Sequence, residues 1–163
     1  MFEGMSEPDR RSNTMSANPR IVVGVDGSPA SEQALKWALD YARAVGGTIH
    51  AVAAWEYPAF YGWGGQGVPT AETFNPEEIA GQTLAQAIEK VAGTEPGVTI
   101  TRDVVPGGAP QALLSAAKGA ALLVVGSRGL GGFSGVLLGS VSRHVTEHAP
   151  CPVTVVREGA VAA

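Results

Sequence analysis

The sequence lacks features that several classes of protein require. It contains one cysteine, Cys151, so an internal disulfide is excluded and the fold does not depend on an oxidising compartment. Its 15 acidic and 11 basic residues give a formal net charge of -4, and the basic residues are scattered along the chain, which argues against binding to nucleic acid. No apolar run reaches the length of a membrane span. We therefore predict a globular protein of the cytoplasm.

The N-terminal residues lack the apolar central segment of a secretory signal and carry charges of both signs. We interpret residues 1–19 as a tail, with Met15 as an alternative start. The remaining length suits one compact core. We therefore predict a single domain over residues 20–158 and a short C-terminal tail over 159–163.

Short apolar runs alternate with helix-like segments along this domain. Predicted strands cover the runs RIVVGV, TIHAVAAW, VTITRDVV, ALLVVG and PVTVV, and the predicted helices lie between them. Strands that alternate with helices in this way form a parallel sheet that is covered on both faces. The fold class is therefore α/β, an open five-stranded parallel sheet whose ligands bind at the carboxyl ends of the strands.

Capping residues mark where the first two helices begin. Ser28 followed by Pro29 predicts one helix start, and Asn75 followed by Pro76 predicts another, with Glu78 completing a pattern like a capping box. Apolar residues recur at helical spacing in both segments. They are Ala34, Ala38, Tyr41 and Val45 in the first helix, which Gly46 and Gly47 end, and Leu84, Ile88 and Val91 on the inner face of the second.

Residues 55–74 hold more than half of the chain's aromatic residues, among prolines and glycines. The segment is too rich in proline for a helix. It is either an irregular connection whose rings cover the core, or a lid or partner surface above the ligand edge. The sequence does not decide between the two.

Three motif matches fail on their context. Gly62, Gly64 and Gly67 match a dinucleotide-binding pattern, but no strand leads into them. His144, Glu147 and His148 match a zinc-peptidase pattern, but Pro150 ends that helix at once, so we interpret these histidines as surface residues of the last turn. Asp, Ser and His residues match the composition of a hydrolytic triad, but no serine lies in a nucleophile-elbow sequence. We therefore predict no catalytic residue.

A glycine-rich loop follows the fourth predicted strand. Gly126, Gly129 and Gly139 have the spacing G-x2-G-x9-G, and Ser140 and Ser142 follow. The first two could turn the backbone at positive φ or let a phosphate approach, and the third opens a helix whose free N–H groups favour an anion. Alternatively, Ser140 only caps the helix and the glycines only bend a loop. Spacing alone leaves both readings open.

Together with VVGVDGS near the start and HAPCPVTVV near the end, this motif resembles the universal stress protein family over residues 20–158. The resemblance implies a sheet in the order 3-2-1-4-5 and, in the branch that carries the glycines, ATP bound at the carboxyl edge. It also implies a homodimer paired through the last strand. That strand comprises Pro152, Val153, Thr154, Val155 and Val156.

The resemblance assigns site residues position by position. Asp26 is expected near the phosphates and a Mg²⁺ ion, or toward the ribose. The full expected ATP site is Gly24, Val25, Asp26, Ala53, Ala54, Val125, Gly126, Ser127, Arg128, Gly129, Gly139, Ser140, Val141 and Ser142. Relatives often carry an Asp where this chain has Ala120 and Ala121, at the end of the strand away from the site.

These residues predict an ATP-binding protein of the stress response in which catalysis is slow or absent. No general base is placed for attack on the γ-phosphate, and the loop lacks the lysine of P-loop enzymes. One alternative is a weak ATPase, or an enzyme that phosphorylates its own Ser140 or Ser142. The other is an interaction module that binds cyclic AMP or AMP. Cys151 has no second cysteine or base near it in sequence, so packing explains it better than redox sensing.

Overall fold

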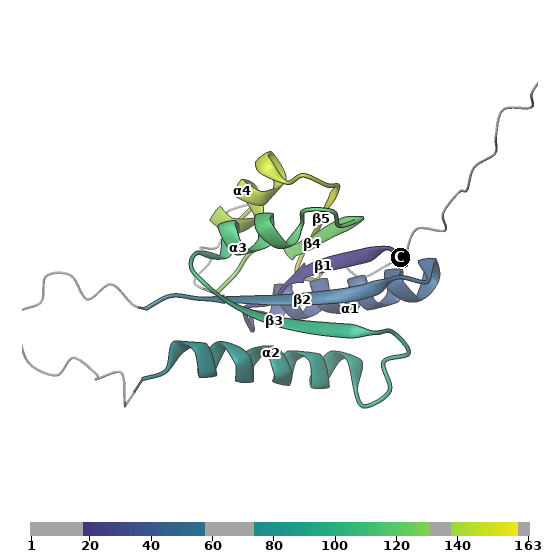
Figure 1. Cartoon of the computed structure of the whole chain (residues 1–163), viewed down its shortest axis with the longest axis horizontal. Coiled ribbons are helices and arrows are strands. Elements are labelled where there is room, and N and C mark those ends of the chain that lie inside the picture. The colour runs from purple at the N-terminus through teal and green to yellow at the C-terminus, as the bar shows by residue number, and fades with distance from the viewer. Residues whose placement is uncertain (1–17, 58–73, 131–137, 160–163) are drawn as a thin grey trace, which may run out of the picture.

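The computed structural model describes residues 18–57, 74–130 and 138–159. Five parallel strands form one sheet in the order β3-β2-β1-β4-β5, which confirms the predicted fold class and strand order (Figure 1). The strands are β1 Arg20–Gly24, β2 Thr48–Trp55, β3 Ile100–Pro106, β4 Leu122–Gly126 and β5 Val153–Val156. The helices are α1 Pro29–Val45, α2 Pro76–Ala92, α3 Ala109–Ala116 and α4 Ser140–His148. Most of the aromatic segment 55–74 and the N-terminal tail lie outside the described residues.

The predicted caps fix the starts of the two long helices. Ser28 Oγ accepts a hydrogen bond from the Ser31 N–H at 3.2 Å, and Asn75 Oδ1 accepts one from the Glu78 N–H at 3.2 Å. Each side chain satisfies a backbone donor that the helix itself leaves free. α1 ends at Gly46, whose φ of 67° lies in the left-handed region that glycine adopts without strain.

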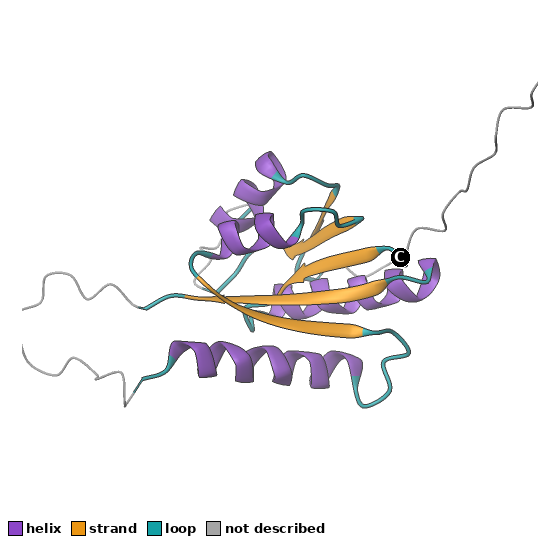
Figure 2. Cartoon of the chain, in the orientation of Figure 1, coloured by secondary structure: helices purple, strands orange, loops and turns teal. Residues whose placement is uncertain are grey.

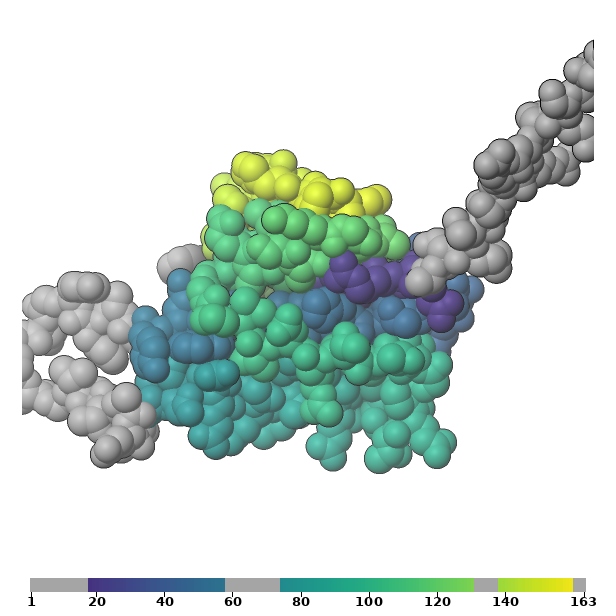
Figure 3. Space-filling view, viewed as in Figure 1, coloured from purple at the N-terminus to yellow at the C-terminus, as the bar shows by residue number. Residues whose placement is uncertain are grey.

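The helices cover the two faces of the sheet in pairs. α1 and α2 pack on one face, against a cluster that includes Ile21, Val23 and Ile49, and α3 and α4 pack on the other, against Val22, Val52 and Leu123. Figure 2 shows the strands between these two layers, and in Figure 3 the α4 and β5 end of the molecule lies opposite α2. Burial on both faces explains why the strands read as continuous apolar runs.

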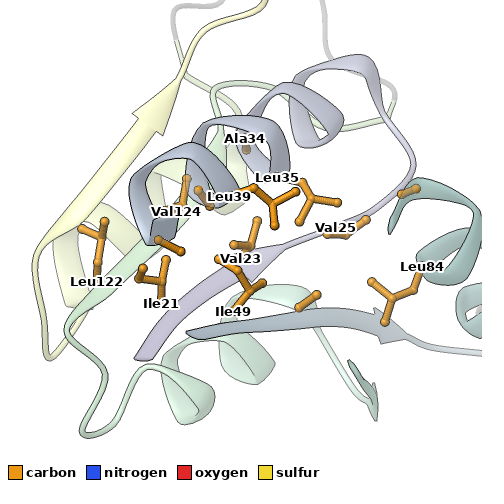
Figure 4. Close-up of a cluster of buried hydrophobic side chains, with 14 of the residues drawn as sticks. Ile21, Val23, Val25, Ala34, Leu35, Leu39, Ile49, Leu84, Leu122 and Val124 are labelled. Carbon is orange, nitrogen blue, oxygen red and sulfur yellow. The ribbon is translucent and has the colours of Figure 1, made fainter. Parts of the chain in front are cut away.

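The inner face of α1 differs in part from the prediction. Ala34, Ala38 and Ala42 are fully buried, and Leu35 and Leu39 beside them point into the core (Figure 4). Tyr41 and Val45, however, are 39% and 41% exposed. Tyr41 lies at the border of the buried stripe, and Val45 lies in the last turn of the helix. The prediction from helical spacing that both line the inner face is therefore wrong. In α2 the prediction is confirmed. Leu84 is buried, and Ile88 and Val91 pack against the same core.

At the amino end of the sheet, the Arg20 side chain connects β1 to the end of α3. Its guanidinium donates to the Ala116 carbonyl at 2.8 Å and to the Lys118 carbonyl at 2.7 Å, which satisfies carbonyls at the C-terminal end of α3. The Ala121 N–H donates to the Arg20 carbonyl at 2.9 Å, so Ala120 and Ala121 lie at the end of the sheet away from the site, as predicted.

Cys151 packs partly buried against the core beneath α3 and α4. Burial raises the pKa of its thiol, an effect that the nearby Arg20 charge only partly offsets. A thiol held in its neutral form is a poor nucleophile, which agrees with a packing role. Of the helices in the three described ranges, none has the length and apolar composition that crossing a membrane requires.

Candidate functional site

A cavity of about 450 Å³ opens at the carboxyl ends of β1, β2 and β4. This is where the strand order reverses, because the chain adds β2 and β3 on one side of β1 and β4 and β5 on the other. The volume lies in the range of small-molecule sites. Twelve of the predicted site residues line it, namely Gly24, Val25, Asp26, Ala54, Val125, Gly126, Arg128, Gly129, Gly139, Ser140, Val141 and Ser142.

Two predicted site residues do not line this cavity. Ala53 is 3% exposed and belongs to the core under α1 and α2, whereas its neighbour Ala54 faces the cavity side of the sheet. Successive residues of a strand point to opposite faces, so only one of the two could face the ligand. Ser127 is also 3% exposed, and its carbonyl is used inside the loop.

Asp26 connects the β1–α1 turn to the β4–α4 loop at the carboxyl edge of the sheet. Its Oδ1 accepts the Ser28 N–H at 2.9 Å, and its Oδ2 accepts the Leu130 N–H at 3.1 Å. We call this arrangement the Asp26 bridge. Gly27, between Asp26 and Ser28, has a φ of 82°, a left-handed conformation that this tight turn requires and that glycine adopts without strain. The turn therefore uses both side chains: Asp26 accepts the Ser28 N–H, and Ser28 caps α1.

Neighbouring protein atoms lie close to Gly126 and Gly129, backbone atoms in the first case and the end of a side chain in the second. A Cβ on Gly126 would lie 2.7 Å from the Ala30 carbonyl carbon, and one on Gly129 would lie 2.6 Å from Asp26 Oδ2. Neither glycine has a positive φ. Of the two predicted reasons, the positive φ is therefore wrong, and the approach of a phosphate stays a prediction. The structure adds a further reason, which is close contact with α1 and with the Asp26 bridge.

Gly139 differs from the first two motif glycines. It is the N-cap of α4, with a φ of -70°, and a Cβ there would meet Ser127 O at 3.4 Å and Arg128 Cα at 3.5 Å, which are ordinary contact distances. Its N–H donates to the Ser127 carbonyl at 2.7 Å and so ties the end of the loop to its beginning. Among the described residues, then, no atom excludes a Cβ at position 139.

The first turn of α4 faces the cavity without a capping side chain. Ser140 is the first helical residue rather than the cap, and no side chain bonds to the N-terminal N–H groups. The Ser142 hydroxyl is buried, within 3.0 Å of both the Ser127 and the Gly139 carbonyl oxygens, so it holds the loop closed. The cap alternative for Ser140 is therefore wrong, and of the two hydroxyls Ser140 is the exposed one.

The cavity also has residues that the sequence analysis missed. Apolar side chains form one part of it, with Val52 from β2 and Ala109 and Leu113 from α3. Ala109 and Leu113 are one helical turn apart, but the sequence could not show that α3 turns this face to the end of β1. The remaining missed residues are Ser28, Ser31, Leu130, Leu138 and Arg143.

The charged residues of the lining are Asp26, Arg128 and Arg143. Two arginines thus border the cavity together with the first turn of α4, while the single carboxylate already accepts hydrogen bonds from two N–H groups. In a chain whose net charge is -4, this is a local excess of positive charge, which favours an anionic ligand.

These features define a class: an open parallel α/β protein with a cavity at its topological switch point that combines an apolar side with an anion-attracting helix N-terminus. The family model described as the universal stress protein family matches residues 18–157. The chain therefore belongs to the universal stress protein family.

Known proteins agree with this assignment. A universal stress protein of Mycolicibacterium smegmatis is 40% identical over 140 residues, which cover 84% of this chain but 45% of that protein. The chain thus spans less than half the length of this relative. A solved universal stress protein in complex with cAMP is 29% identical, with a TM-score of 0.60 over 86% of this chain and 98% of that one. Universal stress protein UspA from Lactobacillus plantarum, 24% identical with a TM-score of 0.69 over 86% of this chain and 99% of that one, shares the fold.

Proposed function

We propose that this chain binds ATP in the cavity at the carboxyl edge of the sheet and acts as a nucleotide-dependent protein of the stress response in the cytoplasm. The observation that carries the proposal is the uncapped first turn of α4, which lies beside Gly139 and two arginines in a cavity whose other side is apolar. An adenine ring suits Val52, Ala54 and Leu113, and phosphates suit the N–H groups of Ser140 and its neighbours.

Asp26 would hold a Mg²⁺ ion that accompanies the nucleotide. It is the carboxylate of the lining, and Mg²⁺ bound to nucleotide phosphates commonly needs only one or two protein carboxylates. Each Asp26 oxygen accepts one N–H and keeps a second lone pair. The ion would neutralise phosphate charge at the open end of the cavity.

The lining favours binding over turnover. Its described residues include no lysine and no histidine, and their one carboxylate accepts hydrogen bonds from two backbone donors. None of these described groups is therefore placed as a general base. Ser140, whose hydroxyl is exposed, is the residue that an autophosphorylating alternative would use. Binding of cyclic AMP is the second candidate function, because a relative of 29% identity forms a complex with cAMP.

The test is to titrate the protein with ATP, AMP and cyclic AMP by calorimetry, with and without Mg²⁺. We expect ATP to bind more tightly than either monophosphate, and more tightly with Mg²⁺ than without it. Tighter binding of cyclic AMP would instead favour the second candidate. Mass spectrometry after incubation with ATP checks the enzyme alternative, since stoichiometric phosphoserine would contradict a function of binding alone.

We also propose a homodimer paired through β5. This strand lies at the edge of the sheet, and its residues Val153–Val156 are all half-buried. An apolar edge strand with free backbone groups can be covered by its counterpart in a second copy. Residues 152–156 would form the contact, and sedimentation velocity measures the mass that this pairing requires.

A further inference from the structure

We propose that Arg143 is a specificity residue that makes this site prefer a polyphosphate chain to a single phosphate. The inference rests on the proposed nucleotide site and extends it to the length of the ligand's phosphate chain. It concerns a residue outside the glycine motif, in the fourth position of α4, that is part of the cavity lining.

The backbone places Arg143 one helical turn beyond Gly139. The Arg143 N–H donates to the Gly139 carbonyl at 3.0 Å, so the two residues lie on the same side of α4. Side chains of a helix lean toward its N-terminus, which directs the long stem of Arg143 back to the uncapped first turn. Arg128 approaches the same turn from the β4 side, since a Cβ on Gly139 would lie 3.5 Å from its Cα.

The two arginines differ in exposure. Arg128 is half-buried and Arg143 is exposed, so Arg128 lies deeper and Arg143 at the rim. If the nucleoside occupies the apolar side at Ala54 and Leu113, the first phosphate meets the deeper groups and later phosphates extend toward the rim. Arg143 is then the group that a triphosphate reaches and a monophosphate does not.

The charge of Arg143 also favours a triphosphate over a monophosphate. Among the described residues, none forms a hydrogen bond or ion pair with the Arg143 side chain, so none of them competes with a ligand for its donors. Hydrogen bonds between guanidinium and phosphate are among the stronger ones in proteins because both partners are charged. A cyclic monophosphate carries one negative charge at neutral pH, whereas a triphosphate carries several and places some of them at the rim.

The experiment compares Arg143→Gln with the wild type by calorimetry, using ATP, AMP and cyclic AMP as ligands. We expect the Kd for ATP to rise about tenfold, while the Kd values for AMP and cyclic AMP change by less than about twofold. Arg143→Lys should restore part of the ATP affinity, because it keeps the charge and loses the forked donor geometry. The salt dependence of ATP binding should also become weaker in Arg143→Gln.

Arg102→Gln is the matched control, because it removes the same charge from an exposed position on β3 that does not line the cavity. It should leave all three affinities unchanged. An equal loss for all three ligands in Arg143→Gln, or no loss for ATP, overturns the inference while the proposed function stands. A wild-type protein that binds none of the three ligands overturns both, so the two failures are distinguished by the wild-type titration.

Discussion

The two ends of the β4–α4 loop carry glycines of one motif, but these glycines have different neighbours. At the beginning of the loop, a Cβ on Gly126 would clash with the Ala30 backbone, and a Cβ on Gly129 would clash with the end of the Asp26 carboxylate. At its end, Gly139 meets only atoms at ordinary contact distances and lines the cavity. The first pair is therefore explained by packing, whereas the third glycine has no packing reason within the described residues.

This contrast separates two reasons why a motif position can be glycine, one in the packing of the fold and one in the binding of the ligand. A glycine that the fold requires affects ligand binding indirectly, because its replacement displaces α1 or the Asp26 bridge. A glycine that the fold tolerates replacing affects the ligand directly. Substitutions at the two ends of the loop should therefore act on different measurable quantities, namely the free energy of unfolding and the affinity for nucleotide.

The largest effect is expected from Gly126→Ala. The new Cβ would lie within 2.9 Å of three atoms of Ala30, of which two belong to the backbone, so the first turn of α1 must shift. Overpacking of this kind costs about 2–3 kcal/mol of stability. Urea denaturation monitored by circular dichroism measures the loss.

Gly81→Ala is the matched control for that substitution. Gly81 lies inside α2, where a Cβ would have its nearest contact 3.9 Å away at Val104. Alanine is the better helix former, so this variant should gain about 0.5–1 kcal/mol. If Gly126→Ala were as stable as the wild type, close packing could not be the reason for the first motif glycine.

The fold was predictable because its signals are local. Apolar runs of strand length, Ser28 and Asn75 as caps, and Gly46 as a stop each act within a few residues of where they occur. The order of the strands came from the family resemblance. The misplacement of Tyr41 on the inner face of α1 shows the limit of spacing, since the width of a buried stripe depends on what packs against it.

The site was predictable only in part, because its geometry depends on distant segments. Spacing located the glycine loop, but the reasons for Gly126 and Gly129 lie in Ala30 and Asp26, about a hundred residues earlier in the chain. Leu113 was missed because nothing local shows which face of α3 meets the cavity. Arg143 was missed because an isolated charge on a helix usually belongs to a solvated face.

A smaller effect, and a different kind, is expected from Gly139→Val. A branched side chain in place of this N-cap should lower stability by about 1 kcal/mol or less, but it would occupy space beside the uncapped turn of α4. We expect the Kd for ATP to rise at least about 30-fold, which is roughly 2 kcal/mol. Calorimetry with ATP measures the affinity, and urea denaturation measures the stability.

Gly139→Ala sharpens the same test. Its single Cβ meets the Ser127–Gly129 backbone at ordinary distances, so its stability should match that of the valine variant while its loss of affinity is smaller. Unchanged ATP affinity in Gly139→Val would show that the third glycine does not face the phosphates. The contrast between the two ends of the loop would then have no functional meaning.

A modest effect on both stability and affinity is expected from Asp26→Ala, which removes the Asp26 bridge between the two loops. Two N–H groups lose their acceptor, but both loops are solvent-accessible at Asp26, so the loss of stability should be about 1 kcal/mol. Asp26→Asn keeps an acceptor oxygen and should lose less. Both variants remove the carboxylate charge that would hold Mg²⁺, so ATP affinity measured with Mg²⁺ should fall while affinity measured without it changes little. An equal loss of ATP affinity with and without Mg²⁺ would assign Asp26 to the ribose. Asp26 would then act on the glycine-rich loop only through its hydrogen bond with the Leu130 N–H.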